Sequence, residues 1–114
     1  GFLFGFLLAN KMGLPFILIR KAGKLPYKKV THVYNLEYGS GEVEMHIDSV
    51  KPSWNILIHD DLLATGGTAD AAANLVKMQG ANVAGFSFIV ELDFLKGRER
   101  LRNHSENIIS LVNY

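Results

Sequence analysis

One stretch, residues 56–68 (ILIHDDLLATGGT), constrains the fold more than any other part of the chain. A run of aliphatic residues stops at Asp60 and Asp61, a small glycine-containing loop follows, and an alanine-rich segment comes next. This order predicts a central strand over 55–59, a tight turn, and a helix capped by Thr68. Strands that alternate with helices in this way build a parallel sheet, so we expect a single α/β domain in these 114 residues.

The rest of the chain repeats the alternation of helix and strand. Residues 1–12 predict a buried helix, with Gly13 as its C-terminal cap. A short, continuously apolar run is typical of a strand that is covered on both faces of a parallel sheet. Such a strand is predicted at 15–19, and two further strands are predicted at 83–92 and 107–113. The helix after the loop should end at Gly80 and bury Ala71, Leu75 and Met78.

Residues 42–48 have a different pattern, because apolar and polar side chains alternate strictly. This period is that of a half-exposed strand. A turn over 39–41 would let residues 31–38 pair back as an antiparallel partner. The sequence therefore predicts an antiparallel flap, at about 24–48, that projects from the parallel core.

Composition excludes several classes of function. With 48% hydrophobic and 20% charged residues, the chain can bury a core, and its net charge of +1 gives no case for a nucleic-acid or anionic membrane partner. The apolar start is shorter than the roughly 20 residues that span a bilayer. There are no cysteines, which excludes a thiolate metal site and is compatible with the cytosol, and the four histidines lack metal-ligand spacing.

The loop at 64–68 predicts an anion site. Unpaired N–H groups and the helix dipole favour a phosphate at a helix N-terminus, and Gly66 and Gly67 allow the backbone to approach it closely. Thr65 and Thr68 add hydroxyl donors. The alternative is an ordinary turn between a strand and a helix. An ATPase loop is disfavoured, because its lysine is missing.

Charged residues nearby suit a sugar phosphate. Asp60 and Asp61 can accept hydrogen bonds from hydroxyl groups or bind a magnesium-bound ligand, unless one acid caps the loop and only the other contacts the ligand. Arg20, Lys21 and Lys24 are closely spaced cations that suit a diphosphate, although most such runs are solvated surface.

DDLLATGGT after an apolar strand resembles the ribose-phosphate binding motif of the type I phosphoribosyltransferases. The chain is most similar to the adenine-specific members of this family. The similarity rests on several separated motifs and spans nearly the whole chain: GFLFG at 1–5, IRKAGKLP at 19–26, LEYG at 36–39 and VELDFLKGRERL at 90–101.

The resemblance implies an enzyme of purine salvage that converts adenine and phosphoribosyl pyrophosphate to AMP and pyrophosphate. It implies Mg²⁺ carried in by the substrate, a homodimer and a cytoplasmic location. By this resemblance, Asp60 and Asp61 would bind the ribose hydroxyls, Arg20 would reach the neighbouring subunit's site, and Leu92 would pack near the purine. Glu37 and Tyr38 would assist the base from a closing flap. Ala64, Thr65, Gly66, Gly67 and Thr68 would bind the 5′-phosphate, and Arg20, Lys21 and Lys24 the pyrophosphate.

By the same resemblance, we expect the chain to lack an N-terminal part of the family that carries the pyrophosphate loop and much of the base-covering hood, and to have little activity alone. Two other functions stay open: transfer to another base such as xanthine or orotate, and a non-catalytic regulator that binds ribose phosphates. Glu91 is expected to be structural, residues 96–102 an exposed helix face, and His59 is given no role.

Overall fold

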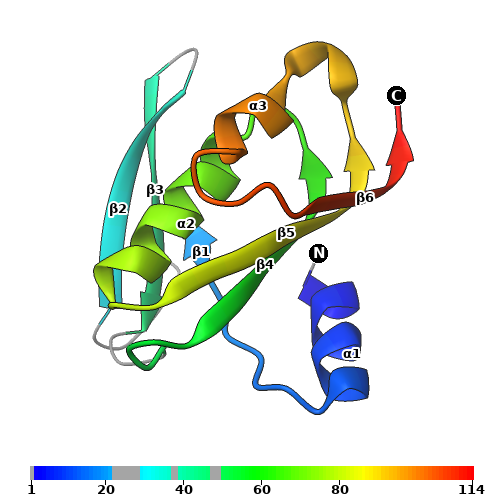
Figure 1. Cartoon of the computed structure of the whole chain (residues 1–114). Coiled ribbons are helices and arrows are strands. Elements are labelled where there is room, and N and C mark those ends of the chain that lie inside the picture. Colours follow the sequence, from blue (N-terminus) through cyan, green and yellow to red (C-terminus); the bar gives the residue numbers. More distant parts are fainter. Residues whose placement is uncertain (1, 22–28, 37–38, 47–49) are drawn as a thin grey trace.

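The computed structural model describes residues 2–21, 29–36, 39–46 and 50–114 (Figure 1). Its elements form a parallel sheet, an antiparallel sheet and three α-helices. The parallel sheet has the order β4 (Asn55–Leu63), β5 (Asn82–Glu91), β6 (Ile108–Asn113). The antiparallel sheet has the order β1 (Arg20–Lys21), β3 (Gly39–His46), β2 (Lys29–Leu36). The helices are α1 (Phe2–Met12), α2 (Gly67–Met78) and α3 (Gly97–Leu101), and a 3₁₀ turn, η1, covers Asp93–Leu95. No helix in the described ranges is long and apolar enough to cross a membrane.

The parallel sheet confirms the α/β prediction, but the place of β4 in it was predicted wrongly. Among the described strands β5 lies in the centre and β4 at an edge. The strand also runs beyond residue 59, because Leu62 pairs with Val90 and Leu63 pairs with Glu91. Leu63 is 1% exposed, so its burial in the core keeps the chain extended past the two acids.

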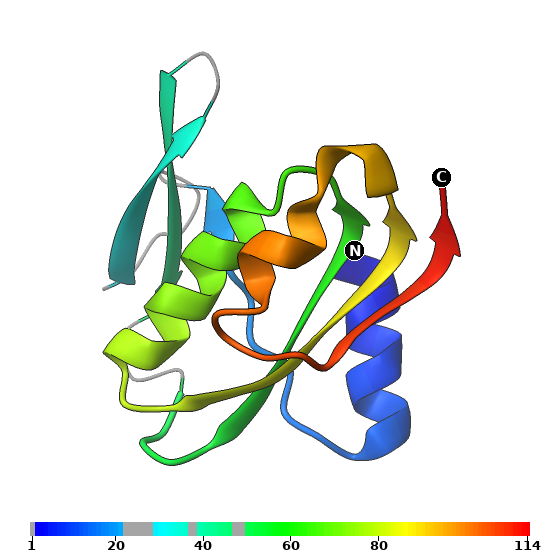
Figure 2. The same cartoon turned by 45° about the horizontal axis from the view of Figure 1, so that its top comes forward.

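Helix α2 packs between the two sheets, against β2 and β3 on one side and β4 and β5 on the other (Figure 2). Four buried alanines let both sheets approach the helix axis closely: Ala69, Ala71, Ala72 and Ala73. Leu75 is buried as predicted. Met78 is 59% exposed, so its prediction was wrong, and Val76 is buried instead.

The ends of α2 are set by two glycines. Gly66 has φ 87° and is the N-cap, without a side-chain cap hydrogen bond, so the prediction of Thr68 as the cap was wrong. The left-handed turn at Gly66 lets the helix start at Gly67, earlier than predicted, and leaves Thr68 inside the first turn. At the other end Gly80 has φ 82° and donates to the Lys77 carbonyl, which confirms the predicted stop.

The predicted flap is confirmed as an antiparallel ribbon. Its register runs from Lys29 opposite His46 to Leu36 opposite Gly39. The residues 39–41 therefore belong to β3, and their assignment to a turn was wrong. Val43 and Met45 are buried in the core cluster that includes α2, so this part of the ribbon is a wall of the domain while its far end extends beyond α2 (Figure 2).

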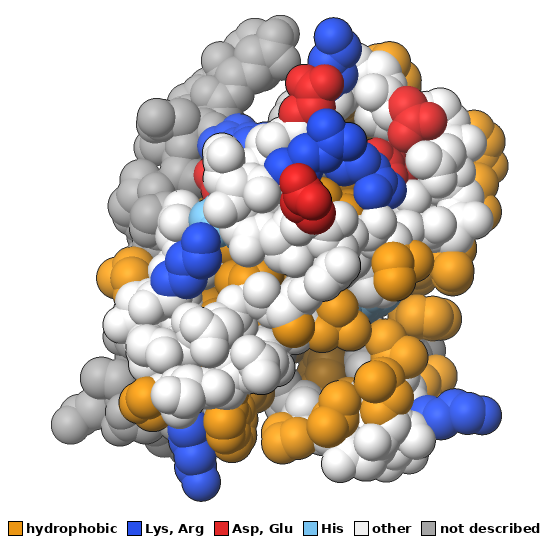
Figure 3. All heavy atoms as spheres, in the orientation of Figure 1, with side chains coloured by type: hydrophobic (Ala, Val, Ile, Leu, Met, Phe, Trp, Pro, Cys, Tyr) orange, Lys and Arg blue, Asp and Glu red, His pale blue; other side chains and the backbone are white. Residues whose placement is uncertain are grey.

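Helix α1 forms as predicted, and Gly13 ends it with φ 69°. Its burial was predicted wrongly: Phe4, Leu7 and Met12 are 40%, 54% and 55% exposed. The helix contacts β4 along a narrow strip, where Gly5 packs against the His59 ring. Figure 3 shows hydrophobic side chains gathered over this part of the surface.

Residues 14–19 do not form the predicted strand. A cleft of about 770 Å³ separates them from β4, and its walls also include parts of α1 and α2. Ile17 and Ile19 still pack against the core, which accounts for the apolar run. The run has no hydrogen-bonding ladder beside it, because the near edge of β4 lies across the cleft. A strand needs a neighbouring strand to pair with as well as a buried position. The apolar run predicted the burial, but it did not show whether a partner strand lies beside it.

Candidate phosphoribosyl-binding site

The loop at 64–68 joins the carboxyl end of β4 to α2. Gly66 and Gly67 are buried, whereas Thr65 and Thr68 are exposed, so the loop presents its hydroxyl-bearing residues to solvent. The Gly67 N–H donates a long hydrogen bond of 3.4 Å to the Thr65 hydroxyl, which is weak at that distance. The start of a twelve-residue helix thus opens to solvent beside two threonines, an arrangement that suits a phosphate.

The two acids lie just before this loop, within β4 rather than at its end as predicted. Asp60 is half-buried, and its Oδ1 accepts a hydrogen bond of 2.8 Å from the Asp61 N–H. This carboxylate therefore bonds to its neighbour within β4 and not to the loop, and both interpretations of the acid pair stay predictions. Asp61 is exposed, and Asp60 and Thr68 both line the cleft beside β4.

The structure describes some of the other predicted site residues and not others. Leu92 follows β5 and donates from its N–H to the Leu63 carbonyl at 2.9 Å, so it lies at the same sheet edge as the loop. Arg20 and Lys21 form β1, of which the backbone is described. Lys24, Glu37 and Tyr38 lie outside the described residues, so their roles stay predictions.

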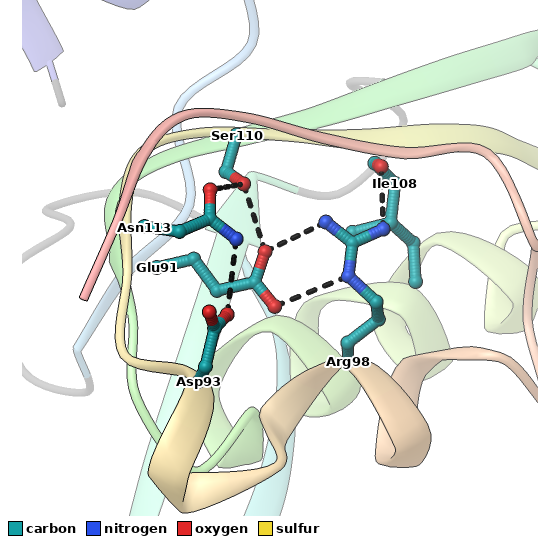
Figure 4. Close-up of polar contacts among 6 residues, drawn as sticks. All are labelled: Glu91, Asp93, Arg98, Ile108, Ser110 and Asn113. Atoms are coloured by element: carbon teal, nitrogen blue, oxygen red, sulfur yellow. Dashed lines mark hydrogen bonds and ion pairs between the residues drawn. The ribbon is translucent and has the colours of Figure 1, made fainter.

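A buried ion pair behind the loop was missed in the sequence analysis (Figure 4). Arg98 donates to both carboxylate oxygens of Glu91, from Nε at 3.1 Å and from Nη2 at 2.6 Å, and its Nη1 donates to the Ile108 carbonyl at 2.7 Å. The Ser110 hydroxyl lies 2.8 Å from Glu91 Oε1, and Glu91 is 3% exposed. The Arg98 hydrogen bonds hold the pKa of Glu91 below its ordinary value.

This pair bears on two predictions. Glu91 is structural, as expected, but residues 96–102 are not simply an exposed face, because Arg98 is half-buried and Gly97 is buried. The sequence did carry a signal. A carboxylate at the end of a buried strand needs a partner, and an arginine seven residues later is long enough to supply one.

His59 lines the cleft and was given no role in the sequence analysis. Its Nδ1 lies 3.3 Å from the Ser87 hydroxyl, and its ring packs on Phe4 with 5.1 Å between ring centroids. Among the residues that the structure describes, the Nε2 atom is buried without a hydrogen-bond partner. Burial lowers the pKa of His59 below 6.5, although Asp60 and Asp61 act to raise it.

Within the described part of the chain, no group of three histidine or carboxylate side chains could hold a metal ion. Two carboxylates, a loop of amides and two hydroxyl groups therefore define the polar chemistry at this sheet edge. These groups suit a phosphorylated sugar, with the anion at the helix start and the hydroxyls near the acids.

Comparisons with known proteins agree with this chemistry. No protein-family model matches the chain. An adenine phosphoribosyltransferase of Cytophaga hutchinsonii is 50% identical over 114 residues, and the chain spans 63% of that relative's length. The crystal structure of adenine phosphoribosyltransferase from Thermoanaerobacter pseudethanolicus has a TM-score of 0.93 and 46% identity, covering 100% of this chain and 65% of that one. The Saccharomyces cerevisiae enzyme, complexed with an imino-altritol bisphosphate and adenine, has a TM-score of 0.88 and 43% identity, covering 96% of this chain and 61% of that one.

A parallel sheet with the acid pair and the loop at its edge, matched along the whole chain, defines a domain of the phosphoribosyltransferase fold. Within that class, the chain belongs to the adenine phosphoribosyltransferase family. It spans less than two thirds of the length of these relatives.

Proposed function

We propose that the protein to which this chain belongs transfers a phosphoribosyl group from phosphoribosyl pyrophosphate to adenine, giving AMP and pyrophosphate in purine salvage. The observation that carries the proposal is the start of α2, which follows Asp60 and Asp61 by a short loop and where the Gly67 N–H makes a weak hydrogen bond of 3.4 Å to the Thr65 hydroxyl. The yeast relative solved with adenine and a bisphosphate supports the choice of base.

In the proposed reaction, adenine N9 forms a bond to C1 of the ribose while the bond from C1 to the pyrophosphate oxygen breaks, and the N9 proton passes to the departing pyrophosphate. The pyrophosphate leaves with the bonding electrons, and positive charge develops on the sugar ring. The amides and hydroxyls at 64–68 hold the 5′-phosphate and so fix the sugar, and Asp61 stabilises the positive charge. Asp60 orients this edge through its bond to the Asp61 N–H.

The remaining roles follow from the family resemblance. Leu92 packs near the purine, and Arg20, Lys21 and Lys24 neutralise the pyrophosphate. Glu37 and Tyr38 close over the base. Mg²⁺ arrives with the pyrophosphate of the substrate, because this ion prefers phosphate oxygens and retained waters to an all-protein cage.

We also propose that the active form is a cytoplasmic homodimer in which Arg20 reaches the neighbouring subunit's site. The cysteine-free sequence suits a reducing compartment. Measurement of the mass in solution by sedimentation tests the dimer, and a monomer with full activity would contradict it.

The test of function is an assay of AMP formation from adenine, phosphoribosyl pyrophosphate and Mg²⁺, made with this chain and with the protein that contains it. Guanine, hypoxanthine and orotate serve as competing bases. We expect adenine to be preferred, and preference for another base would support the sister-enzyme alternative. Binding of ribose 5-phosphate without AMP formation by the longer protein would support the non-catalytic regulator.

A variant separates catalysis from folding in the same assay. We expect Asp61→Asn to lower kcat on the order of 10²-fold, because it removes the charge that stabilises the transition state. The melting temperature should stay near that of the wild type. The control is Glu99→Gln, which neutralises an exposed acid on α3. Equal losses of stability and activity in Asp61→Asn would count against its catalytic role.

A further inference from the structure

The backbone of α3 touches the loop at 64–68 directly. A Cβ atom added at Gly97 would lie 2.4 Å from the Ala64 carbonyl oxygen, 2.8 Å from a Leu63 methyl and 3.1 Å from the Gly66 nitrogen. A Cβ atom added at Gly66 would lie 2.8 Å from the Gly97 carbonyl oxygen. The two glycine backbones are therefore in contact, and a side chain at either position would displace the loop from α3.

The turn that presents Gly97 has an unusual backbone. Lys96 has φ 55° and ψ 32°, a left-handed conformation that residues with a side chain rarely adopt. Its N–H donates to the Asp93 carbonyl at 3.1 Å, and its carbonyl accepts from the Glu99 N–H at 3.2 Å. Such a conformation persists where the surrounding structure holds it, so the position of Gly97 is well determined.

Arg98 supplies the next link. Its two hydrogen bonds to Glu91 tie α3 to the carboxyl end of β5, and its third, to the Ile108 carbonyl, ties α3 to the start of β6 (Figure 4). Glu91 is in turn bonded to Ser110 of β6. A continuous set of contacts thus runs from the sheet through Arg98 and Gly97 to the back of the loop.

We propose that Gly97 and Arg98 are positioning residues for the phosphate loop. Gly97 sets where the loop backbone lies, and Arg98 fixes Gly97 to the sheet. This inference rests on the proposed function, because it takes the loop as the 5′-phosphate site. A small displacement of a binding group weakens the interactions that depend on its geometry. Loss of either residue therefore weakens binding of the phosphorylated sugar more than it weakens binding of the base.

The chain offers a matched control for Gly97→Ala. A Cβ atom at Gly85 would lie 2.7 Å from the Asn107 carbonyl oxygen and 3.0 Å from its Cβ, so Gly85→Ala creates a similar clash in β5, against the connection to β6. Both variants are compared with the wild type by calorimetric titration with ribose 5-phosphate and, separately, with adenine. Their melting temperatures are measured alongside.

We expect both variants to lose similar thermal stability, and Gly97→Ala to weaken ribose 5-phosphate binding about tenfold or more, a factor that corresponds to about 1.4 kcal/mol. Gly85→Ala should bind it as the wild type does, and adenine binding should stay within twofold in both. In the active protein, Gly97→Ala should raise the KM for phosphoribosyl pyrophosphate more than it lowers kcat. Equal affinity for ribose 5-phosphate in the two variants would overturn the proposal.

Arg98→Lys provides a second test should Gly97→Ala not fold. Lysine keeps the charge but lacks the planar fork that reaches both Glu91 oxygens and the Ile108 carbonyl. We expect weaker ribose 5-phosphate binding, while Arg100→Lys, an exposed change on the same helix, should have no effect. Unchanged affinity in Arg98→Lys would overturn the role of Arg98. Absence of ribose 5-phosphate binding by the wild type would overturn the proposed function as well, so the two failures are distinguishable.

Discussion

The two faces of β4 are packed very differently. On one face Ile58 meets α2, where Ala71, Ala73 and Leu75 are fully buried. On the other face the next residue, His59, meets α1, where Phe4 and Leu7 are about half exposed and a cleft remains open. Successive strand residues point to opposite faces, so one short strand separates a dense core from a loosely covered surface.

This difference has a consequence for the site. The loop at 64–68 is continuous with α2 and is backed by Gly97, so it belongs to the densely packed side. The cleft runs along the edge of β4, where residues of both faces line it, and it reaches the loop, because Asp60 and Thr68 are among its lining residues. Packing against Gly97 therefore holds the anion-binding backbone in place, and the cleft leaves room through which a ligand can approach.

The largest expected effect is a loss of stability, and it appears when a leucine on one face and a leucine on the other face are each replaced by alanine. Leu75→Ala on α2 removes a side chain with 0% exposure and should lower the free energy of unfolding by about 2–5 kcal/mol. Leu7→Ala on α1 removes one that is 54% exposed and should change it by about 0.5 kcal/mol or less. Urea unfolding of this chain measures both. Similar losses in the two variants would remove the distinction between the faces.

The second effect concerns the ion pair behind the loop. Arg98→Ala leaves the Glu91 carboxylate buried with Ser110 as its remaining hydrogen-bond partner, and should cost about 3 kcal/mol. The control is Arg100→Ala, which breaks a more exposed pair with Asp70 and should cost about 1 kcal/mol or less. Equal costs would show that the burial of Glu91 does not make its pair with Arg98 more important for stability than the pair of Arg100 with Asp70.

The same pair predicts a dependence on pH. Because the pKa of Glu91 is lowered from 4.5, the folded state binds a proton there less readily than the unfolded state. The pair stabilises the folded state fully above pH 4.5, and this stabilisation is lost as the pH falls through the lower pKa that Glu91 has in the folded state. The free energy of unfolding, measured between pH 3 and 7, should therefore fall less steeply in acid for Glu91→Gln than for the wild type. An unchanged slope would contradict the lowered pKa.

The smallest effect is expected at His59, on the loosely covered face. Its pKa is lowered from 6.5 by burial, so protonation favours the unfolded state, and stability falls as the pH drops below 6.5. His59→Leu removes this dependence and the unpartnered Nε2 atom. We expect a gain of about 1 kcal/mol at pH 5.5 and a smaller one at pH 8. A loss at both values would show that the Ser87 contact outweighs the buried nitrogen.

Local patterns predicted the elements of the dense side well. The alternation of apolar runs with an alanine-rich helix gave β4, α2, β5 and β6, and the glycines at 13 and 80 marked helix ends, because a left-handed cap is a local property. The glycine at 66 was assigned to ligand approach, whereas it also starts α2. Both uses need the same backbone freedom, so the sequence did not separate them.

The failures fall where tertiary neighbours decide the outcome. The apolar content of α1 and of residues 14–19 predicted burial and a strand, but α1 meets β4 along a narrow strip, and residues 14–19 line a cleft and belong to no strand of the described sheets. The contact between Gly97 and the loop joins positions far apart in the chain. No periodicity in the sequence encodes such a contact, whereas the order of strand, acid pair, glycine-containing loop and helix could be predicted from the residues alone.

We propose that backbone amides at the start of α2 bind the 5′-phosphate of a sugar. A titration of the isotope-labelled chain with ribose 5-phosphate, followed by the amide resonances in NMR spectra, tests this binding, with ribose as the unphosphorylated control. We expect the largest shifts at Thr65, Gly66, Gly67 and Thr68, and we expect ribose not to produce them. Binding of ribose 5-phosphate that leaves these four amides unchanged would contradict this proposal.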